Sequence, residues 1–181
     1  MSRPKVIVIT GPESTGKSLL TQRLALEFGT SWSPEFARSY LEIHGPSYQF
    51  EDLRPIAEGQ VSVQNLATKK ASEIVFMDTD LLTIKIWSEF VFGKIDPWIL
   101  EQWSRSIVDH YLLCDIDLSW EPDPLREHPQ HRKELFEIYH TNIRESGTPY
   151  SIIRGLEEER FSNAMKVLKD LGHSPSSRSS S

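Results

Sequence analysis

The sequence predicts an α/β fold, in which a parallel β-sheet carries helices on both faces. The first observation is a short, almost uninterrupted β-branched run, Lys5-Val6-Ile7-Val8-Ile9-Thr10, which is typical of a strand buried on both faces. The second is that further short apolar runs alternate with stretches of helical periodicity, which indicates a parallel sheet. The third is that polar residues follow each apolar run, and ligands bind at that edge of such sheets.

The strand candidates follow one another in a regular order. A weaker run over residues 30–33 ends at Pro34-Glu35, and stronger runs over 74–77, 111–114 and 150–153 end at Asp78, Asp115 and Arg154. Because the carboxyl ends of parallel strands meet at one edge, these polar residues and Thr10-Gly11 are expected to lie together. Strands often end in polar loops, so this pattern by itself is weak.

Helical patterns lie between the strand candidates. Each pattern is marked by residues that share one helix face. They are Leu20, Leu24 and Phe28 before Gly29; Ile56, Gln60, Val63 and Ala67; Ile99 and Trp103 after Asp96-Pro97; and Phe161, Ala164, Met165 and Leu168 before Gly172. Asp96 followed by Pro97 is typical of an N-cap and a first helical residue. Glycine after the last apolar position is typical of a helix end.

Length and composition favour one globular domain. The chain has 181 residues, of which 38% are hydrophobic, and its net charge is −6. We expect one domain over residues 1–172 and a disordered Ser-rich tail over 173–181. The negative charge argues against binding to nucleic acid or an anionic membrane. The sole cysteine, Cys114, lies in an apolar run and is expected to be a buried thiol. With neither a signal peptide nor a long apolar segment apparent, a cytoplasmic location is expected; the oligomeric state stays open.

Residues 11–18, Gly-Pro-Glu-Ser-Thr-Gly-Lys-Ser, match the phosphate-binding pattern G-x-x-x-x-G-K-[ST] between a predicted strand and a predicted helix. Gly16 allows close approach of a phosphate, Lys17 places a charge on the β- and γ-phosphates, and the Ser18 hydroxyl ligates Mg²⁺. The residues predicted to hold ATP are Gly11, Glu13, Ser14, Thr15, Gly16, Lys17, Ser18 and Leu19.

Three carboxylates are candidates for the chemistry. Asp78 ends an apolar strand, as does the aspartate that holds Mg²⁺ in P-loop proteins. Asp80, two residues on, shares a side with Asp78 if the chain stays extended, although Asp80 could equally cap the helix that opens at Leu81. Glu35 could accept the proton of an attacking hydroxyl, with Arg38 one turn on; a surface Glu–Arg pair is the alternative. The choice of base between Glu35 and Asp80 stays open.

A charged segment over residues 120–133 could close over the nucleotide. Arg126 and Arg132 are the arginines predicted to neutralise the transferring phosphoryl group, and a solvated charged helix is the alternative. His128 and His131 are three residues apart, but we expect them to be exposed to solvent rather than to form a metal pair. Trp87 and Trp120 are candidates to stack on a flat base or pyridinium ring.

Other P-loop classes fit less well. A guanine-reading N/T-K-x-D motif is lacking, and Thr79 follows Asp78 where AAA+ ATPases carry a glutamate that activates water. The short chain also argues against a mechanical ATPase. A kinase for a small molecule therefore fits better.

Several sequence blocks resemble the ribosylnicotinamide kinase domain of the bacterial NAD-biosynthesis regulator. They are residues 11–18, P-E-F-A-R-S-Y (34–40), E-G-Q (58–60), D-T-D-L-L-T (78–83) and the stretch 111–127. The resemblance implies a P-loop nucleoside kinase-like three-layer α/β/α fold with a five-stranded parallel sheet of order 2-3-1-4-5 and a helical lid. It implies phosphorylation of the ribose 5′-hydroxyl of nicotinamide riboside, with ATP and Mg²⁺, to nicotinamide mononucleotide.

The same resemblance implies roles for particular residues. Glu35 matches the acidic position after the second strand, Asp78 and Asp80 match the acidic pair near Mg²⁺ and the ribose, and Arg126 and Arg132 match lid arginines. Taken together with the arguments from the residues themselves, the predicted substrate side consists of Glu35, Arg38, Tyr40, Asp80, Trp87 and Trp120.

The sequence also departs from that family. Full-length regulators carry an adenylyltransferase domain and, in some species, a DNA-binding domain. This chain has no H-x-G-H motif, so neither adenylylation nor operator binding is expected. A kinase for another nucleoside or for a nucleotide stays open. So does a non-catalytic ATP-sensing module, which the Ser-rich tail favours.

Overall fold

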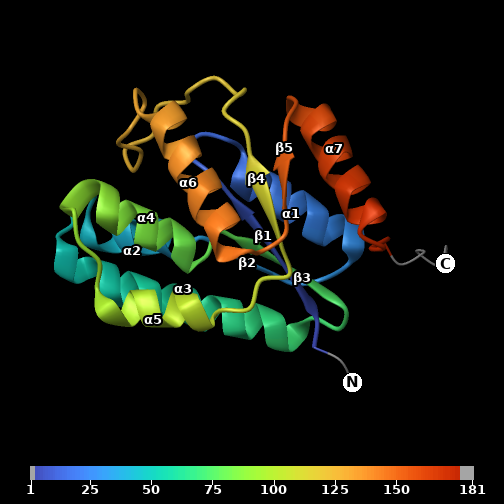
Figure 1. Cartoon of the computed structure of the whole chain (residues 1–181), viewed down its shortest axis with the longest axis horizontal. Helices are drawn as coiled ribbons and strands as arrows, with labels where there is room; N and C mark the ends of the chain where they lie inside the picture. The colour runs from blue at the N-terminus through green and yellow to red at the C-terminus, as the bar shows by residue number, and fades with distance from the viewer. Residues whose placement is uncertain (1–2, 176–181) are drawn as a thin grey trace.

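The computed structural model describes residues 3–175 and contains a five-stranded parallel sheet of order β2-β3-β1-β4-β5 (Figure 1). The strands are β1 (Lys5–Thr10), β2 (Trp32–Ser33), β3 (Ile74–Asp78), β4 (His110–Cys114) and β5 (Tyr150–Ile153). The predicted fold class and the strand order implied by the resemblance are both confirmed, but the implied helical lid is not, because residues 115–131 form turns and irregular loop without a helix. Because β1 lies at the centre of the sheet, both of its faces are covered, which explains its almost uninterrupted apolar sequence.

Helices cover both faces of the sheet and make the three layers visible in Figure 1. The helices are α1 (Lys17–Phe28), α2 (Phe36–His44), the 3-10 turn η1 (Phe50–Asp52), α3 (Leu53–Lys70), α4 (Leu81–Phe92), α5 (Pro97–Arg105), α6 (Arg132–Ser146) and α7 (Glu157–Asp170). Helices α1 and α7 lie on one side of the sheet, and α6 lies with α2–α5 on the other. The segment between β4 and α6 passes over the top of the molecule in this view.

Alternate residues of the central strands supply two separate cores. Ile7, Ile9 and Phe76 pack toward α1 and α7, whereas Val8 and Met77 pack toward α3, α4 and α6. Successive side chains of a strand point to opposite faces, so a continuous apolar run fills both cores. Each fully buried side chain of this size contributes roughly 1.5–3 kcal/mol to the hydrophobic term. A third cluster joins α2, α3, α4 and α5 beyond the sheet.

The predicted helix ends agree with the structure. Gly29 caps α1 with φ 60°, and its N–H donates to the carbonyls of Ala25 and Leu26. Asp96 accepts a hydrogen bond from the Trp98 N–H at 2.7 Å, with Pro97 as the first residue of α5. Strand β2 is shorter than the predicted run over 30–33, because this edge strand pairs with β3 through two residues, Trp32 and Ser33.

Other global expectations have mixed outcomes. Cys114 is fully buried, as predicted. Within residues 3–175, every helix is too short or too polar to span a bilayer. Residues 176–181 of the predicted tail lie outside the described residues, so the expectation of disorder there stays a prediction.

Candidate active site

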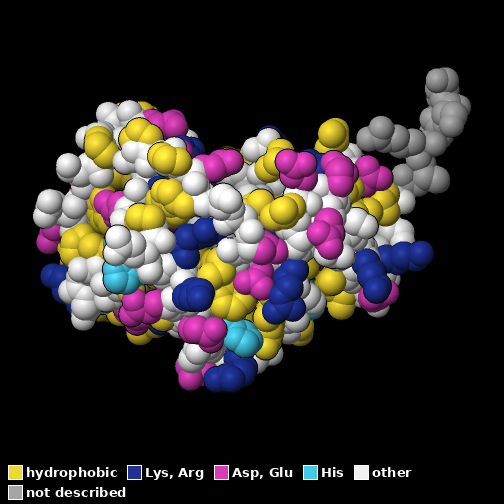
Figure 2. Space-filling model, turned by 90° about the horizontal axis from the view of Figure 1, so that it is seen from above, with side chains coloured by type: hydrophobic (Ala, Val, Ile, Leu, Met, Phe, Trp, Pro, Cys, Tyr) yellow, Lys and Arg dark blue, Asp and Glu magenta, His cyan; other side chains and the backbone are white. Residues whose placement is uncertain are grey.

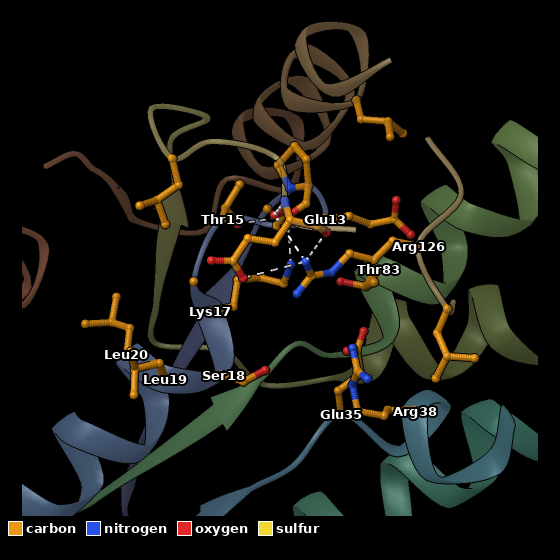
Figure 3. A pocket seen from close by; sticks show the side chains of 18 of the residues that line it. Glu13, Thr15, Lys17, Ser18, Leu19, Leu20, Glu35, Arg38, Thr83 and Arg126 are labelled. Atoms are coloured by element: carbon orange, nitrogen blue, oxygen red, sulfur yellow. Dashed lines mark hydrogen bonds and ion pairs between the residues drawn. The ribbon is translucent and has the colours of Figure 1, made fainter. Parts of the chain in front are cut away.

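A cavity of about 530 Å³ opens at the carboxyl edge of the sheet, with the loop 11–18 as one wall (Figure 3). Its lining divides by element into two lobes. The α7 lobe consists of Leu19, Arg23, Glu157, Arg160 and Phe161. The α2 lobe consists of Glu35, Arg38, Thr83, Trp87, Phe90 and Tyr139. Of the polar strand ends predicted to meet, Gly11 and Glu35 line this cavity, whereas Asp78, Asp115 and Arg154 are absent from its described lining.

The loop 11–18 depends on two glycines. Gly11 has φ 133°, and a Cβ there would lie 2.8 Å from the carbonyl oxygen of Cys114 in β4. Gly16 has φ 74° and occupies the N-cap of α1. Other residues rarely adopt these dihedrals. Because glycine offers no capping side chain, the first-turn N–H groups of α1 are left to an anion in the loop.

Lys17 lies inside the loop rather than out in solvent. Its Nζ donates to the carbonyl oxygen of Pro12 at 2.8 Å, and the Thr15 hydroxyl donates to the same oxygen at 2.8 Å. Figure 3 shows Lys17 and Ser18 facing the opening that Glu35 and Arg38 border from the other side. The loop therefore holds its ammonium group within the cavity wall, where a phosphate would meet it.

Asp78 has the features of a cation ligand. Its side chain is 2% exposed, and its Oδ1 has no hydrogen-bond partner among the described residues. Burial first, and the charge of Glu35 second, raise the pKa of Asp78 to about 6, while the Ser18 hydroxyl acts in the opposite direction. A buried carboxylate oxygen without a donor is costly unless a cation or water meets it. Asp78 and Ser18 therefore fit the predicted magnesium pair.

Asp80 is turned away from the cavity, and its predicted role as base or substrate ligand is corrected. Thr79 has φ 64°, so the chain is not extended there and the two carboxylates do not share a side. Asp80 Oδ1 accepts from the Leu82 N–H at 3.1 Å, and Oδ2 accepts from the Tyr111 hydroxyl at 2.7 Å. The capping alternative is the correct one, because both oxygens are already used.

Glu35 reaches the cavity from the turn before α2, and α3 holds that turn. Gln60 Oε1 accepts from the Phe36 N–H at 2.8 Å, and its Nε2 donates to the carbonyl of Pro34 at 3.2 Å. A Cβ on Gly59 would lie 2.1 Å from the Phe36 ring, so only glycine leaves room for it. Gln60 and Gly59 position this turn, a role that the sequence analysis did not assign to either residue. Both residues lie in the E-G-Q block (58–60) that contributed to the resemblance, but the block by itself does not show which turn they contact.

The charged segment over residues 120–133 is called the lid below, and its two arginines lie in different places. Arg126 lines the cavity, and its Nη1 donates to the Ser14 hydroxyl at 3.3 Å. Arg132 is the first residue of α6; it donates to the carbonyls of Ser14 at 3.0 Å and Leu118 at 2.8 Å, and it is absent from the described cavity lining. The prediction that Arg132 closes over the phosphoryl group is therefore corrected: its guanidinium supports loop backbone.

Glu13 lies in the loop but contacts the lid. Its carboxylate accepts hydrogen bonds from the backbone N–H groups of Glu127 and His128, both at 3.1 Å. Ser14 adds a second tie, because its hydroxyl accepts from the Glu121 N–H at 2.9 Å. A carboxylate would repel phosphate, so docking the lid onto the loop suits Glu13 better than the predicted ATP contact.

The three predicted aromatic residues differ in their position relative to the cavity. Trp87 lines the cavity and packs against Tyr48 with ring centroids 4.5 Å apart. Trp120 is absent from the described lining. Tyr40 is also absent from it, because its hydroxyl donates to Asp52 at 2.8 Å and its ring stacks on His44. The assignment of Tyr40 to the substrate is corrected by these contacts, whereas that of Trp120 stays a prediction.

Phe90 and His128 were not predicted to line the cavity, yet both do. His128 packs edge-on against Phe90 at 5.1 Å, so its expected exposure is wrong, whereas His131 is exposed as expected. Phe90 lies one helical turn after Trp87, and that spacing could have indicated a shared face.

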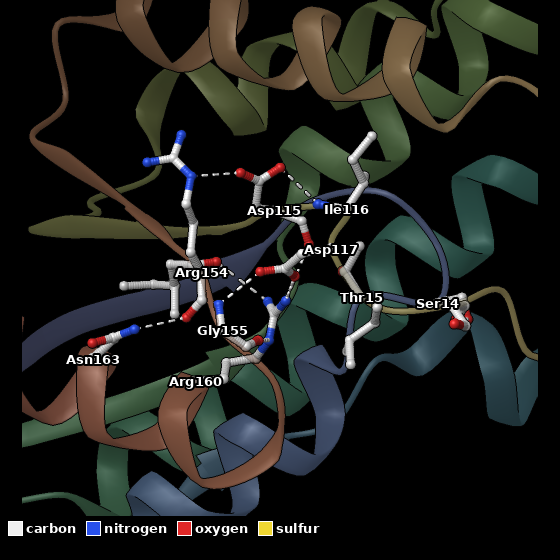
Figure 4. A network of polar contacts seen from close by, with 12 residues as sticks. Ser14, Thr15, Asp115, Ile116, Asp117, Arg154, Gly155, Arg160 and Asn163 are labelled. Atoms are coloured by element: carbon white, nitrogen blue, oxygen red, sulfur yellow. Dashed lines mark hydrogen bonds and ion pairs between the residues drawn. The ribbon is translucent and has the colours of Figure 1, made fainter.

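The polar ends of β4 and β5 form a supporting network (Figure 4). Asp115 accepts from Arg154 Nε at 2.8 Å, and Asp117 accepts from the Gly155 N–H at 2.6 Å and from Arg160. These contacts fix the loop before α7 next to the α7 lobe. On the face shown in Figure 2, acidic and basic side chains are interspersed, so individual pairs rather than a broad field set the local electrostatics.

Comparison with known proteins agrees with this architecture. The trifunctional NAD biosynthesis/regulator protein NadR of Escherichia coli (strain K12) is 26% identical over 181 residues, covering 92% of this chain and 42% of the relative. The crystal structure of NadR protein in complex with NR has a TM-score of 0.83 at 22% identity, covering 98% of this chain and 54% of that one. A second NadR structure, in complex with NAD and AMP-PNP, has a TM-score of 0.77 at 21% identity, covering 98% and 52%.

These matches confirm the resemblance that the sequence blocks predicted. The chain spans less than half the length of the curated relative, 42%. A family model described as an AAA domain matches residues 6–160, which include the loop 11–18, the Glu35 turn, Asp78 and the lid. The chain belongs to the AAA domain family.

Proposed function

We propose that this protein is an ATP- and Mg²⁺-dependent kinase that phosphorylates the ribose 5′-hydroxyl of nicotinamide riboside. One observation carries the proposal: the unpartnered Asp78 Oδ1 lies at the end of β3, between the loop that holds Lys17 and the turn that holds Glu35. Lys17 and Glu35 line one cavity, and Asp78, although absent from its described lining, interacts electrostatically with both, which supports a donor site, a cation ligand and a base acting together.

ATP binds with its phosphates in the loop 11–18 and its adenosine in the α7 lobe. The N–H groups at the start of α1 and the Lys17 ammonium meet the phosphate oxygens. Ser18 and Asp78 are the residues that would hold Mg²⁺, and the ion would supply positive charge to offset that of the phosphates. The supporting observation is that Asp78 is buried and offers a free oxygen.

The acceptor binds in the α2 lobe. Glu35 accepts the proton of the 5′-hydroxyl as its oxygen attacks the γ-phosphorus, the bond to the β,γ-bridging oxygen breaks, and the products are the mononucleotide and ADP. Lys17 and Arg126 face the transferring group from the loop and the lid. Catalysis is mostly positioning and charge stabilisation.

The α2 lobe suits a flat, cationic base. Trp87, Phe90 and Tyr139 offer aromatic surface, and Glu35 adds negative charge to this lobe. An aromatic face attracts a cation, and nicotinamide riboside carries a pyridinium ring. The relatives named as NAD biosynthesis proteins and the structure with NR point to the same acceptor.

A second candidate is a kinase for another nucleoside. Its supporting observation is that Trp87 and Phe90 supply aromatic surface, which stacks on any flat base. Stacking alone does not select a pyridinium ring from a purine or pyrimidine, so the acceptor must be found by assay.

One experiment tests the proposal. Purified protein is given Mg-ATP and, in separate reactions, nicotinamide riboside, natural nucleosides and nucleoside monophosphates, while ADP and the phosphorylated product are both measured. We expect nicotinamide mononucleotide with the highest kcat/KM and none without Mg²⁺. Preference for another nucleoside would favour the second candidate. ATP binding without ADP formation across the panel would contradict both and favour an ATP-sensing module.

A further inference from the structure

The lid and α2 are joined by an ion pair beside the α2 lobe. Arg38 Nη2 lies 3.1 Å from Asp123 Oδ2, and the two side chains are 42% and 20% exposed. Arg38 is one helical turn beyond Glu35 and lines the cavity. The pair therefore connects the acceptor side of the cavity to the segment that covers it.

Asp123 is fixed before it meets Arg38. Its Oδ1 accepts from the Leu125 N–H at 2.9 Å, which leaves Oδ2 for the guanidinium. The Leu125 N–H first and Arg38 second hold the pKa of Asp123 below its usual value, against the effect of burial. Asp123 is therefore charged at neutral pH, and it cancels the charge of Arg38.

The other cations near the α2 lobe already have partners in the loop and the lid. Lys17 Nζ donates to the Pro12 carbonyl, and Arg126 Nη1 donates to the Ser14 hydroxyl and the Glu121 carbonyl. Both therefore face the position of the donor phosphates. Among the described lining residues contributed by α2 and α4, Arg38 is the only arginine or lysine.

A phosphorylated acceptor would meet an unfavourable environment. A phosphate monoester carries about −1.5 to −2 charges at neutral pH, and here it would lie near Glu35 with Arg38 already neutralised. Bidentate binding of phosphate by arginine needs the guanidinium fork that Asp123 partly occupies. An acceptor that is neutral or cationic avoids this cost.

We propose that Asp123 is a specificity-determining residue, which by pairing with Arg38 excludes phosphorylated acceptors and disfavours retention of the monophosphate product. This inference rests on the proposed function, because it assumes that the α2 lobe receives a nucleoside. It restricts the acceptor class to nucleosides with a free 5′-hydroxyl and predicts that the same ion pair assists product release.

The test compares D123N with the wild-type protein by calorimetric titration of nicotinamide riboside and of nicotinamide mononucleotide, both with Mg-ADP present. Freeing Arg38 should tighten mononucleotide binding about tenfold, equivalent to about 1.4 kcal/mol, and change riboside affinity by less than about threefold. The double variant R38Q/D123N should lose the gain, because the released guanidinium is absent.

A matched control separates charge selectivity from lid docking. Glu127 is also a lid carboxylate tied to the acceptor side, since it accepts from the Tyr48 hydroxyl at 2.7 Å. E127Q perturbs that tie without freeing Arg38, so the ratio of the two affinities should stay at the wild-type value. Thermal unfolding of each variant checks that it is folded.

Two results would overturn the inference: D123N weakens both ligands equally, or E127Q shifts the ratio as much as D123N does. The proposed function fails separately. If riboside is not phosphorylated but D123N still tightens the mononucleotide, the kinase assignment is wrong and the charge selectivity stands. If riboside is phosphorylated and D123N leaves the ratio of the two affinities at the wild-type value, the kinase assignment stands and the charge selectivity is wrong.

Discussion

The phosphate loop and the Glu35 turn face each other across one cavity, but they are built in different ways. The loop is a contiguous stretch, 11–18, shaped by the dihedrals of Gly11 and Gly16. The Glu35 turn takes its position from α3, through Gln60 and Gly59. The lid adds a second support, because Asp123 pairs with Arg38. A local sequence pattern is therefore enough to define the loop, whereas tertiary contacts define the acceptor side.

The largest effect should come from the loop. Lys17→Ala removes the ammonium that the proposed function places against the γ-phosphoryl group, so kcat/KM should fall about 10³-fold for every acceptor, a loss of about 4 kcal/mol. Steady-state kinetics and circular dichroism measure activity and fold together. Lys17→Arg keeps the charge and loses the geometry, so it should recover little activity. Unchanged turnover in Lys17→Ala would rule out the role of the loop in transfer.

Glu35→Gln tests the other side of the comparison. Removal of the base should lower kcat by about 10²–10⁴-fold, while ATP affinity stays near the wild-type value because the loop is intact. Rapid quench measures the chemical step, and equilibrium titration measures nucleotide binding. Equal losses in ATP affinity and kcat would show that the two sides are not separable.

Asp78→Asn should lower activity but raise the stability of the ligand-free protein. The activity of the variant should fall at least about 10²-fold. The activity of the wild type should decline below pH 6 as Asp78 protonates. The pKa of Asp78 in the folded protein, about 6, lies above its usual value of 3.8. The protonated carboxyl therefore stabilises the fold at low pH, and this stabilisation is lost as pH rises through 6. The ligand-free variant should therefore be more stable than wild type at pH 8, by on the order of 1–3 kcal/mol.

Thermal and denaturant unfolding at pH 8 and pH 4.5 measure that difference, which should shrink at the lower pH. Mg-ATP should reverse the order at pH 8, because the wild type alone gains the full cation contact. A ligand-free variant that is less stable than wild type at pH 8 would contradict the cost assigned to the unpartnered oxygen.

Gly59→Ala gives the smallest of these effects on activity. The new Cβ would overlap the Phe36 ring, so α2 must shift and carry Glu35 with it. We expect about tenfold lower kcat and about 1–3 kcal/mol lower stability. Phe36→Leu in the same chain should restore part of both, and Ser62→Ala on the exposed face of α3 is the matched control. A tenfold loss without rescue would point to a different cause.

The sequence predicted the sheet, its alternation with helices and the loop, because each depends on spacing along the chain. It placed Asp80 wrongly because one left-handed residue, Thr79, ends the extended geometry on which the argument relied. Arg132 was misplaced for a related reason: residue type indicates charge, but the carbonyls that a guanidinium meets depend on the folded lid. Gln60 was placed on the correct helix face, but spacing along the chain could not show that its amide binds the backbone of the Glu35 turn.

The brevity of β2 has a dynamic consequence. Its ladder consists of Trp32 and Ser33 paired with one neighbouring strand, whereas β1 is laddered on both sides. Amide protons of residues 32–36 should therefore exchange with solvent through local openings that leave β1 protected. Such local openings would release Glu35 while the loop 11–18 keeps its conformation. A nucleotide could therefore remain bound while the α2 lobe opens and closes.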